Sequence, residues 1–177
     1  MEFADLLSRL DPQPGVRGRQ FERICAWYLR NAPEYRGRFK QVWLWKDWPE
    51  AKDPDAGIDL VAVEHGGGKW AIQAKVYDPA YAIKKADVDS FPSESSRPGF
   101  SYRLLIATTD RLGSTAKRTL DAQREPVGYL LRSQLALAPV EWPASDIARQ
   151  YLAGRGRVAR LGLTLERPPM NGRIHTN

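Results

Sequence analysis

The stretch that decides the fold is residues 58–75, which read IDLVAVEHGGGKWAIQAK. Two apolar runs, residues 58–64 and 69–75, flank a His-Gly-Gly-Gly segment, and consecutive glycines tolerate the positive φ angles that a tight turn needs. Both runs are apolar on both faces, as expected for strands that are covered on either side. The stretch therefore predicts a β-hairpin made of two central strands of a sheet.

Three polar side chains interrupt this apolar hairpin. If Gly67 is the centre of the turn, the numbers of facing residues add up to about 134, so Asp59 faces Lys75 and Val61 faces Gln73. Side chains two residues apart share a face of the strand. Asp59, Gln73 and Lys75 are therefore predicted to converge on one patch, whereas a slip of one residue would separate Asp59 from the other two.

Polar groups inside apolar strands need a partner or a function. A partly buried salt bridge between Asp59 and Lys75, which Gln73 helps to satisfy, would account for all three. A catalytic site would account for them as well. The patch lies at a strand end, between Gly57 and a polar loop that follows Lys75, so it can open to solvent.

Hydrophobic spacing predicts further elements around the hairpin. Residues 1–10 are predicted as an amphipathic helix, and a second helix ends near Asn31 with one buried face, formed by Phe21, Ile24, Cys25, Tyr28 and Leu29. Helices are also predicted over residues 84–91, where Pro92 ends the helix, and over 114–123, 133–137 and 145–152, each with a serine as N-cap. Strands are predicted over residues 41–45, 103–108 and 126–131. This alternation indicates an α/β sandwich on a mixed central β-sheet.

Composition sets the class of protein. A chain of 177 residues with 42% hydrophobic and 27% charged content fits one globular domain. The single cysteine, Cys25, excludes an internal disulfide and a cysteine-based zinc site, and the two histidines lie far apart in sequence, at positions 65 and 175. The apolar runs are too short to cross a bilayer and the N-terminus lacks the pattern of a signal peptide. A cytoplasmic protein without membrane contact is expected.

The net charge of +6 is distributed unevenly. Residues 148–177 contain six arginines against one acid, Glu166, and so carry +5 of it. This segment is also rich in Gly and Pro, which is typical of a linker or an exposed arm. The rest of the chain has one local basic cluster: Arg17, Arg19, Arg23, Arg30, Arg36, Arg38 and Lys40. Such a cluster suits contacts with DNA phosphates, and an ordinary solvated surface would explain the charge equally well.

The residues around the predicted patch resemble a known family. Gly57-Ile58-Asp59 is followed, fourteen residues after Asp59, by Gln73-Ala74-Lys75. This pattern resembles the PD-(D/E)XK nuclease superfamily and, within it, the Mrr-like branch, whose motif reads G-x-D and Q-x-K. Residues 42–49, 71–79, 85–91 and 108–111 are further similar to the N-terminal nuclease domain of Type ISP restriction-modification enzymes. The resemblance covers residues 17–145.

The resemblance implies a restriction-endonuclease-like sandwich with an αβββαβ core and a DNA endonuclease that depends on Mg²⁺, with Mn²⁺ as a substitute. Asp59, the side-chain oxygen of Gln73 and the backbone carbonyl of Ala74 would be ligands of the metal ion. Lys75 would orient the attacking water or stabilise the transition state. Glu22, on the N-terminal helix, would support the metal site, although a surface ion pair with a neighbouring arginine is an equal alternative.

The resemblance also implies partners. Double-stranded DNA is the expected substrate, with phosphate contacts at Lys84, Lys85, Arg19 and Arg111, and no segment reads as a base-recognition element. Residues 1–147 would form the nuclease domain, and residues 148–177 would lead towards a translocase, a methyltransferase and a target-recognition domain in the same polypeptide. Two alternatives remain: a DNA-binding or docking module that has lost the chemistry, and a stand-alone Mrr-like nuclease.

Overall fold

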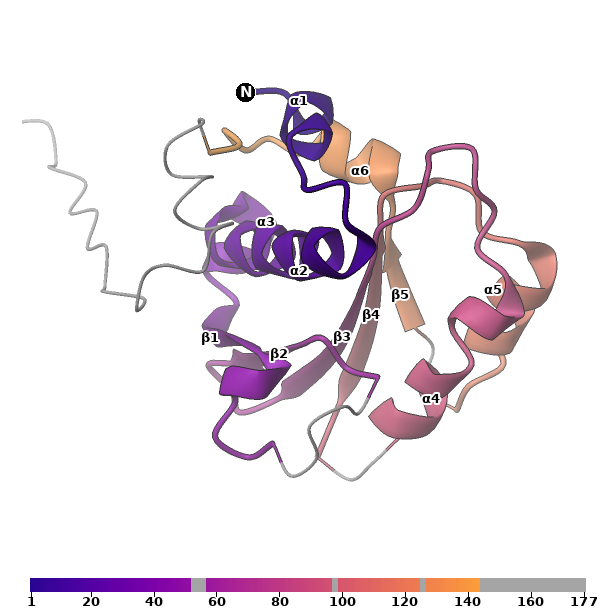
Figure 1. The fold of residues 1–177 in the computed structure, drawn as a ribbon. Coiled ribbons are helices and arrows are strands. Elements are labelled where there is room, and N and C mark those ends of the chain that lie inside the picture. The colour runs from indigo at the N-terminus through magenta and orange to yellow at the C-terminus, as the bar shows by residue number, and fades with distance from the viewer. Residues whose placement is uncertain (52–56, 97–98, 125–126, 144–177) are drawn as a thin grey trace, which may run out of the picture.

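A five-stranded mixed sheet forms the centre of the protein, whose computed structural model describes residues 1–51, 57–96, 99–124 and 127–143 (Figure 1). The spatial order of its strands is the order in sequence: β1 (Phe39–Leu44), β2 (Leu60–Glu64), β3 (Lys69–Lys75), β4 (Tyr102–Ala107) and β5 (Val127–Leu130). β1, β2 and β3 pair antiparallel, whereas β4 and β5 run parallel to β3. The predicted mixed sheet with two central hairpin strands is confirmed.

Helices cover both faces of this sheet. They are α1 (Phe3–Ser8), α2 (Pro14–Asn31), α3 (Pro33–Arg36), α4 (Ser90–Ser95), α5 (Ser114–Asp121) and α6 (Arg132–Ala136), with short 3₁₀ helices η1 (Trp45–Asp47) and η2 (Lys85–Asp87). α2 lies along one face, and α4 and α5 lie on the other (Figure 1). The order α2, β1, β2, β3, α4, β4 reproduces the expected αβββαβ core of a restriction-endonuclease-like fold.

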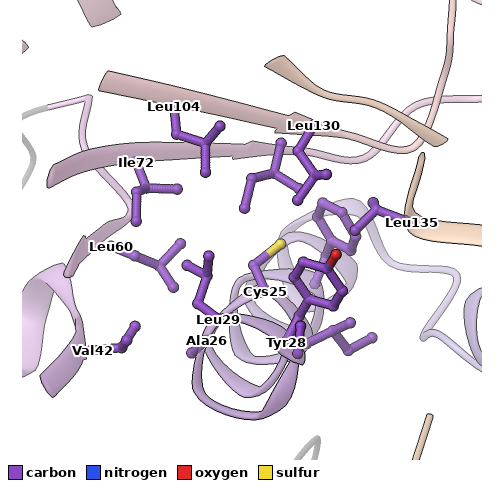
Figure 2. Close-up of a cluster of buried hydrophobic side chains, with 14 of the residues drawn as sticks. Cys25, Ala26, Tyr28, Leu29, Val42, Leu60, Ile72, Leu104, Leu130 and Leu135 are labelled. Atoms are coloured by element: carbon purple, nitrogen blue, oxygen red, sulfur yellow. The ribbon is translucent and has the colours of Figure 1, made fainter. Parts of the chain in front are cut away.

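The long helix α2 is fixed to the sheet by its apolar face. Figure 2 shows Cys25, Ala26 and Leu29 of α2 between the helix and the sheet residues Leu60 and Ile72. These side chains are at most 2% exposed. The prediction of one buried face on this helix is confirmed. Because Glu22 lies one turn before Ala26, the same packing also fixes its position relative to the sheet.

The second core lies between the sheet and the helices α4 and α5. Val61, Ala71 and Leu105 point to this face and pack with Phe91 and Leu120. All five side chains are fully buried. Alternation along β3 puts Gln73 and Lys75 on the same face as Ala71. Gln73 and Lys75 therefore lie on the same face of β3, as predicted.

The predicted register of the hairpin is wrong by two residues. The pairs Leu60–Ile72 and Val61–Ala71 show that the numbers of facing residues add up to 132. The turn closes between Glu64 and Gly68, with the Glu64 N–H donating to Gly68 O at 2.8 Å, and Gly67 supplies the positive φ of 87°. Gly67 therefore ends the turn instead of centring it. A shift of two residues preserves the face of every side chain in the paired residues 60–63 and 69–72.

Three helix boundaries also differ from prediction. Pro92 lies inside the first turn of α4 instead of ending a helix over residues 84–91, because a proline in a first turn removes no intrahelical hydrogen bond. Ser114 is the first residue of α5, and Gly113 takes the N-cap position. Likewise α6 begins at Arg132, with Leu131 as its N-cap in place of Ser133. The helix predicted over residues 145–152 and the basic segment 148–177 lie outside the described residues.

Among the described residues, no helix combines the length and the apolar content needed to cross a membrane.

Candidate active site

One end of the sheet gathers the predicted site residues. Here β1 and β3 end and β2 begins, because the three strands are antiparallel. Asp59 directly precedes β2, and its main chain is fixed on both sides. The Asp59 N–H donates to Ile72 O on β3 at 2.9 Å, and Asp59 O accepts from the Trp45 N–H at 2.8 Å. Asp59 is thus fixed between the ends of two neighbouring strands.

The Asp59 carboxylate lies against the backbone of β3. Its Oδ2 accepts a hydrogen bond from the Ala74 N–H at 2.7 Å. Within a strand, the N–H and C=O of one residue point to the same side, and this side alternates between residues. Lys75 O accepts from the Thr108 N–H, on the β4 side. The Ala74 carbonyl therefore points to the opposite side, towards Asp59, as the predicted role in metal binding requires.

Gln73 contributes a buried oxygen to this end of the sheet. Its side chain is 2% exposed, and its Nε2 donates to Gly57 O at 3.1 Å. The Asp59 N–H donates to Ile72 O and its Oδ2 accepts from the Ala74 N–H, so Gln73 lies between the two β3 residues that bind Asp59. Gln73 Oε1 has no hydrogen-bond partner among the described residues. A buried polar atom without a partner lowers the stability of the fold by about 1–3 kcal/mol, so its presence in a native structure needs an explanation.

Lys75 ends β3 on the same face as Gln73 and is half-buried. In the described part of the chain, no salt bridge joins the Lys75 ammonium group to Asp59 or to another carboxylate. The alternative in which an Asp–Lys salt bridge explains the polar patch is therefore wrong.

Glu22 approaches the site from α2. Burial and the Asp59 carboxylate raise the pKa of Glu22 from its usual value near 4.5 to about 7. The cations Lys46, Arg19 and Arg23 act against this rise. After burial, the Asp59 carboxylate is the largest influence on the pKa of Glu22. The fold brings these two carboxylates together from elements far apart in sequence, and it also leaves the two arginines within electrostatic range of Glu22.

We expect Glu22→Gln to stabilise the metal-free protein at pH 8 but not at pH 4.5. A carboxyl with a raised pKa binds a proton more tightly in the folded state than in the unfolded one. The free energy of unfolding of the wild type therefore falls as the pH rises from 4.5 to 7, and glutamine removes this loss. The gain at pH 8 should be about 1–2 kcal/mol, after allowance for screening of a partly exposed group.

Urea unfolding in EDTA at the two pH values measures this effect. Glu141→Gln, which alters an exposed glutamate, is the matched control and should change neither value. An equal effect of Glu22→Gln at both pH values would contradict the assignment of the raised pKa to Glu22.

The donor atoms of this site are oxygens. They are the Asp59 carboxylate, Gln73 Oε1, the Ala74 carbonyl and, from α2, the Glu22 carboxylate. The described residues hold no group of three or more His, Cys, Asp or Glu side chains that could bind a metal ion, so a zinc-type cluster is not formed there. A small set of hard oxygen donors that includes a neutral amide and a carbonyl suits Mg²⁺, which keeps several waters when bound.

The predicted DNA contacts are exposed, but their surroundings differ. Lys85 forms a salt bridge of 2.7 Å with Asp89. Lys84 lies 5.8 Å from the ring centre of Tyr81. Arg111 donates to a backbone carbonyl of the loop that follows β3, and Arg19 is exposed on α2. Of the four, Arg19 is the one that acts electrostatically on Glu22.

Lys46 was missed by the sequence reasoning. It belongs to η1, immediately after Trp45, whose N–H is bonded to Asp59 O. In the sequence Lys46 begins a polar loop thirteen residues before Asp59, and nothing in that loop distinguishes it. Lys46 could have been placed near Asp59 from the pairing of the strands. Because β1 pairs antiparallel with β2, the residues that follow β1 lie beside those that precede β2.

Comparisons with known proteins agree with this fold. The model of a family described as "Restriction endonuclease" (Mrr_cat_2) matches residues 30–151. The structure is similar to that of the ATP-dependent Type ISP restriction-modification enzyme LlaBIII bound to DNA, with 28% identity and a TM-score of 0.70 over 85% of this chain. The matched part is 9% of the length of that enzyme. The MspJI restriction endonuclease in complex with a 27-mer oligonucleotide is similar over 75% of this chain and 29% of its own, at 18% identity and a TM-score of 0.48. No curated protein matches.

Proposed function

Because this chain belongs to the restriction endonuclease family, we propose that it hydrolyses phosphodiester bonds of double-stranded DNA at the site formed by Asp59, Gln73 and Lys75. One observation carries the proposal. A fully buried side-chain oxygen of Gln73 has no partner among the described residues, and Gln73 lies between the two β3 residues, Ile72 and Ala74, that hydrogen-bond to Asp59. An oxygen that the fold leaves unsatisfied beside a carboxylate is suited to a divalent cation.

Restriction endonucleases of this family generally use divalent metal ions. We propose Mg²⁺ as the ion, with Mn²⁺ as a substitute, and Asp59, Gln73 Oε1 and the Ala74 carbonyl as its protein ligands. When bound, the ion supplies Lewis acidity and lowers the pKa of its water. Glu22 would assist by holding a water or a ligand of the ion on the α2 side. This role rests on its electrostatic closeness to Asp59.

Lys75 has a separate part in the reaction. A water oxygen attacks the phosphorus, the bond to the leaving oxygen breaks, and that oxygen takes up a proton. Negative charge grows on the phosphate oxygens before the bond breaks. The Lys75 ammonium group, which no described carboxylate neutralises, would orient the attacking water and stabilise this charge.

Supercoiled plasmid provides the test of this activity. With Mg²⁺ we expect conversion to nicked and linear forms, and with EDTA we expect none. Because no described segment resembles a base-reading element, products should show no preferred position. Conversion that continues at the same rate in EDTA would overturn the proposal of a metal-dependent nuclease.

We expect Gln73→Glu to bind Mg²⁺ at least about tenfold more tightly, because the charge of the ligands sets affinity at an oxygen site. Without metal the same change should lower the free energy of unfolding, since it adds a third carboxylate to Asp59 and Glu22. Isothermal titration calorimetry measures the first effect, and urea unfolding in EDTA the second. Gln41→Glu, on the exposed part of β1, is the matched control. An unchanged affinity in Gln73→Glu would rule out Gln73 as a ligand.

We further propose that residues 1–147 are the nuclease domain of a longer enzyme of the Type ISP kind. The similarity to LlaBIII over 85% of this chain supports this, and that enzyme is described as ATP-dependent. A translocase, a methyltransferase and a target-recognition domain would then follow in the same polypeptide, joined through residues 148–177. A coding sequence that continues into an ATP-binding motor domain would support this arrangement, and one that ends at residue 177 would refute it.

A further inference from the structure

A cationic side chain flanks the proposed metal site on the side away from Lys75. At this end of the sheet the order across the strands is η1 after β1, then Asp59 before β2, then Lys75 at the end of β3. The hydrogen bond from the Trp45 N–H to Asp59 O fixes η1 beside Asp59. Lys46 and Lys75 therefore stand on opposite sides of Asp59.

The surroundings of Lys46 leave its ammonium group available. Lys46 is exposed, and among the residues that the structure describes no carboxylate lies within salt-bridge distance of it. By contrast, Lys69, Lys85 and Lys117 each pair with a carboxylate. Lys46 directly follows Trp45, whose N–H donates to Asp59 O at 2.8 Å, so its main chain borders the site.

The spacing of the strands relates these two lysines to a DNA strand. Neighbouring strands lie about 4.8 Å apart, so the chain segments that follow β1 and β3 are separated by on the order of 10 Å. Two cations with this separation of their main chains can contact neighbouring phosphates of one strand, which follow each other at about 3.4 Å of helix rise.

The geometry points to Lys46 as a DNA-binding residue that holds a phosphate neighbouring the one that is cut. This inference rests on the proposed nuclease function and adds a substrate contact to it. Lys75 acts on the phosphate at the metal site, while Lys46 fixes the backbone on the β1 side.

Salt dependence of binding distinguishes a phosphate contact from a structural role. A contact with one phosphate contributes about 0.9 to the slope of the logarithm of the binding constant against the logarithm of the salt concentration. The probe is a labelled 30-base-pair duplex of random sequence, and the full chain is titrated in Ca²⁺ at several NaCl concentrations. We expect Lys46→Ala to reduce the slope by about 0.9 and the affinity about 5–10-fold in moderate salt.

Two variants accompany Lys46→Ala. Lys46→Arg retains the charge and should restore the slope. Lys117→Ala removes an exposed lysine of α5 that lies outside the basic cluster and, as the matched control, should leave the slope at the wild-type value. In plasmid cleavage, Lys46→Ala should raise KM and leave kcat nearly unchanged, because its contact is equal in the ground state and the transition state.

The outcomes separate the two proposals. A wild-type chain that binds and cuts DNA, together with a Lys46→Ala variant of unchanged slope, would overturn the inference and leave the proposed function intact. A wild-type chain without salt-dependent binding to the duplex would contradict both. A reduced slope in Lys46→Ala that Lys46→Arg restores would support the phosphate contact.

Discussion

Asp59→Asn should lower the rate of DNA cleavage by about three orders of magnitude, the upper range for removal of one charge-stabilising group. Asparagine has nearly the same shape as aspartate and keeps an oxygen that can accept the Ala74 N–H, so the main chain at the start of β2 should stay in place. The change removes the negative charge of the Asp59 carboxylate. Binding of the metal ion should be lost while the fold is retained.

The measurement is the initial rate of plasmid nicking at saturating Mg²⁺, with thermal unfolding as the test of folding. The Tm of Asp59→Asn should be equal to or above that of the wild type in EDTA, because the change removes the repulsion between Asp59 and Glu22. Asp5→Asn, on the exposed side of α1, serves as the matched control and should cut at the wild-type rate. Wild-type cutting by Asp59→Asn would remove Asp59 from the site.

Lys75→Ala is the second change with a large expected effect. It should lower kcat about 10²–10³-fold, because the growing charge on the phosphate loses its nearest cation on β3. Affinity for Mg²⁺ should stay the same or increase, since the metal ligands remain and a neighbouring positive charge is gone. This pattern differs from that of Asp59→Asn, in which metal binding and cleavage are lost together.

Single-turnover cleavage and calorimetry with Mg²⁺ separate the two effects in Lys75→Ala. Lys117→Ala again provides the control for removal of one lysine. A Lys75→Ala chain with normal kcat but weakened DNA binding would show that Lys75 is a binding residue without a part in the chemical step.

The sequence predicted the hairpin and the face of each polar side chain because both follow from an alternation of period two. Its register was wrong because the turn depends on which glycine takes a positive φ, and three consecutive glycines allow more than one choice. Gly67 takes that conformation at the end of the turn. The error of two residues changes which β3 residues bind Asp59: they are Ile72 and Ala74, whereas the predicted register places Lys75 opposite it.

The parts of the site that the sequence could not show depend on tertiary packing. Glu22 reaches Asp59 only because the apolar face of α2 docks on Leu60 and Ile72. The unsatisfied oxygen of Gln73 depends on which group its amide nitrogen meets, here Gly57 O. Local motifs therefore identify the candidate ligands, and the packing of α2 and β3 determines which of them come together.

The proposed activity requires a divalent ion at the end of β3. Anomalous scattering from a crystal soaked in Mn²⁺ tests this most directly. We predict one strong anomalous peak in contact with the Asp59 carboxylate, Gln73 Oε1 and the Ala74 carbonyl oxygen. Asp59→Asn crystals in the same solution should lack it. A wild-type crystal that binds Mn²⁺ elsewhere, with no peak among these three oxygens, would contradict the account.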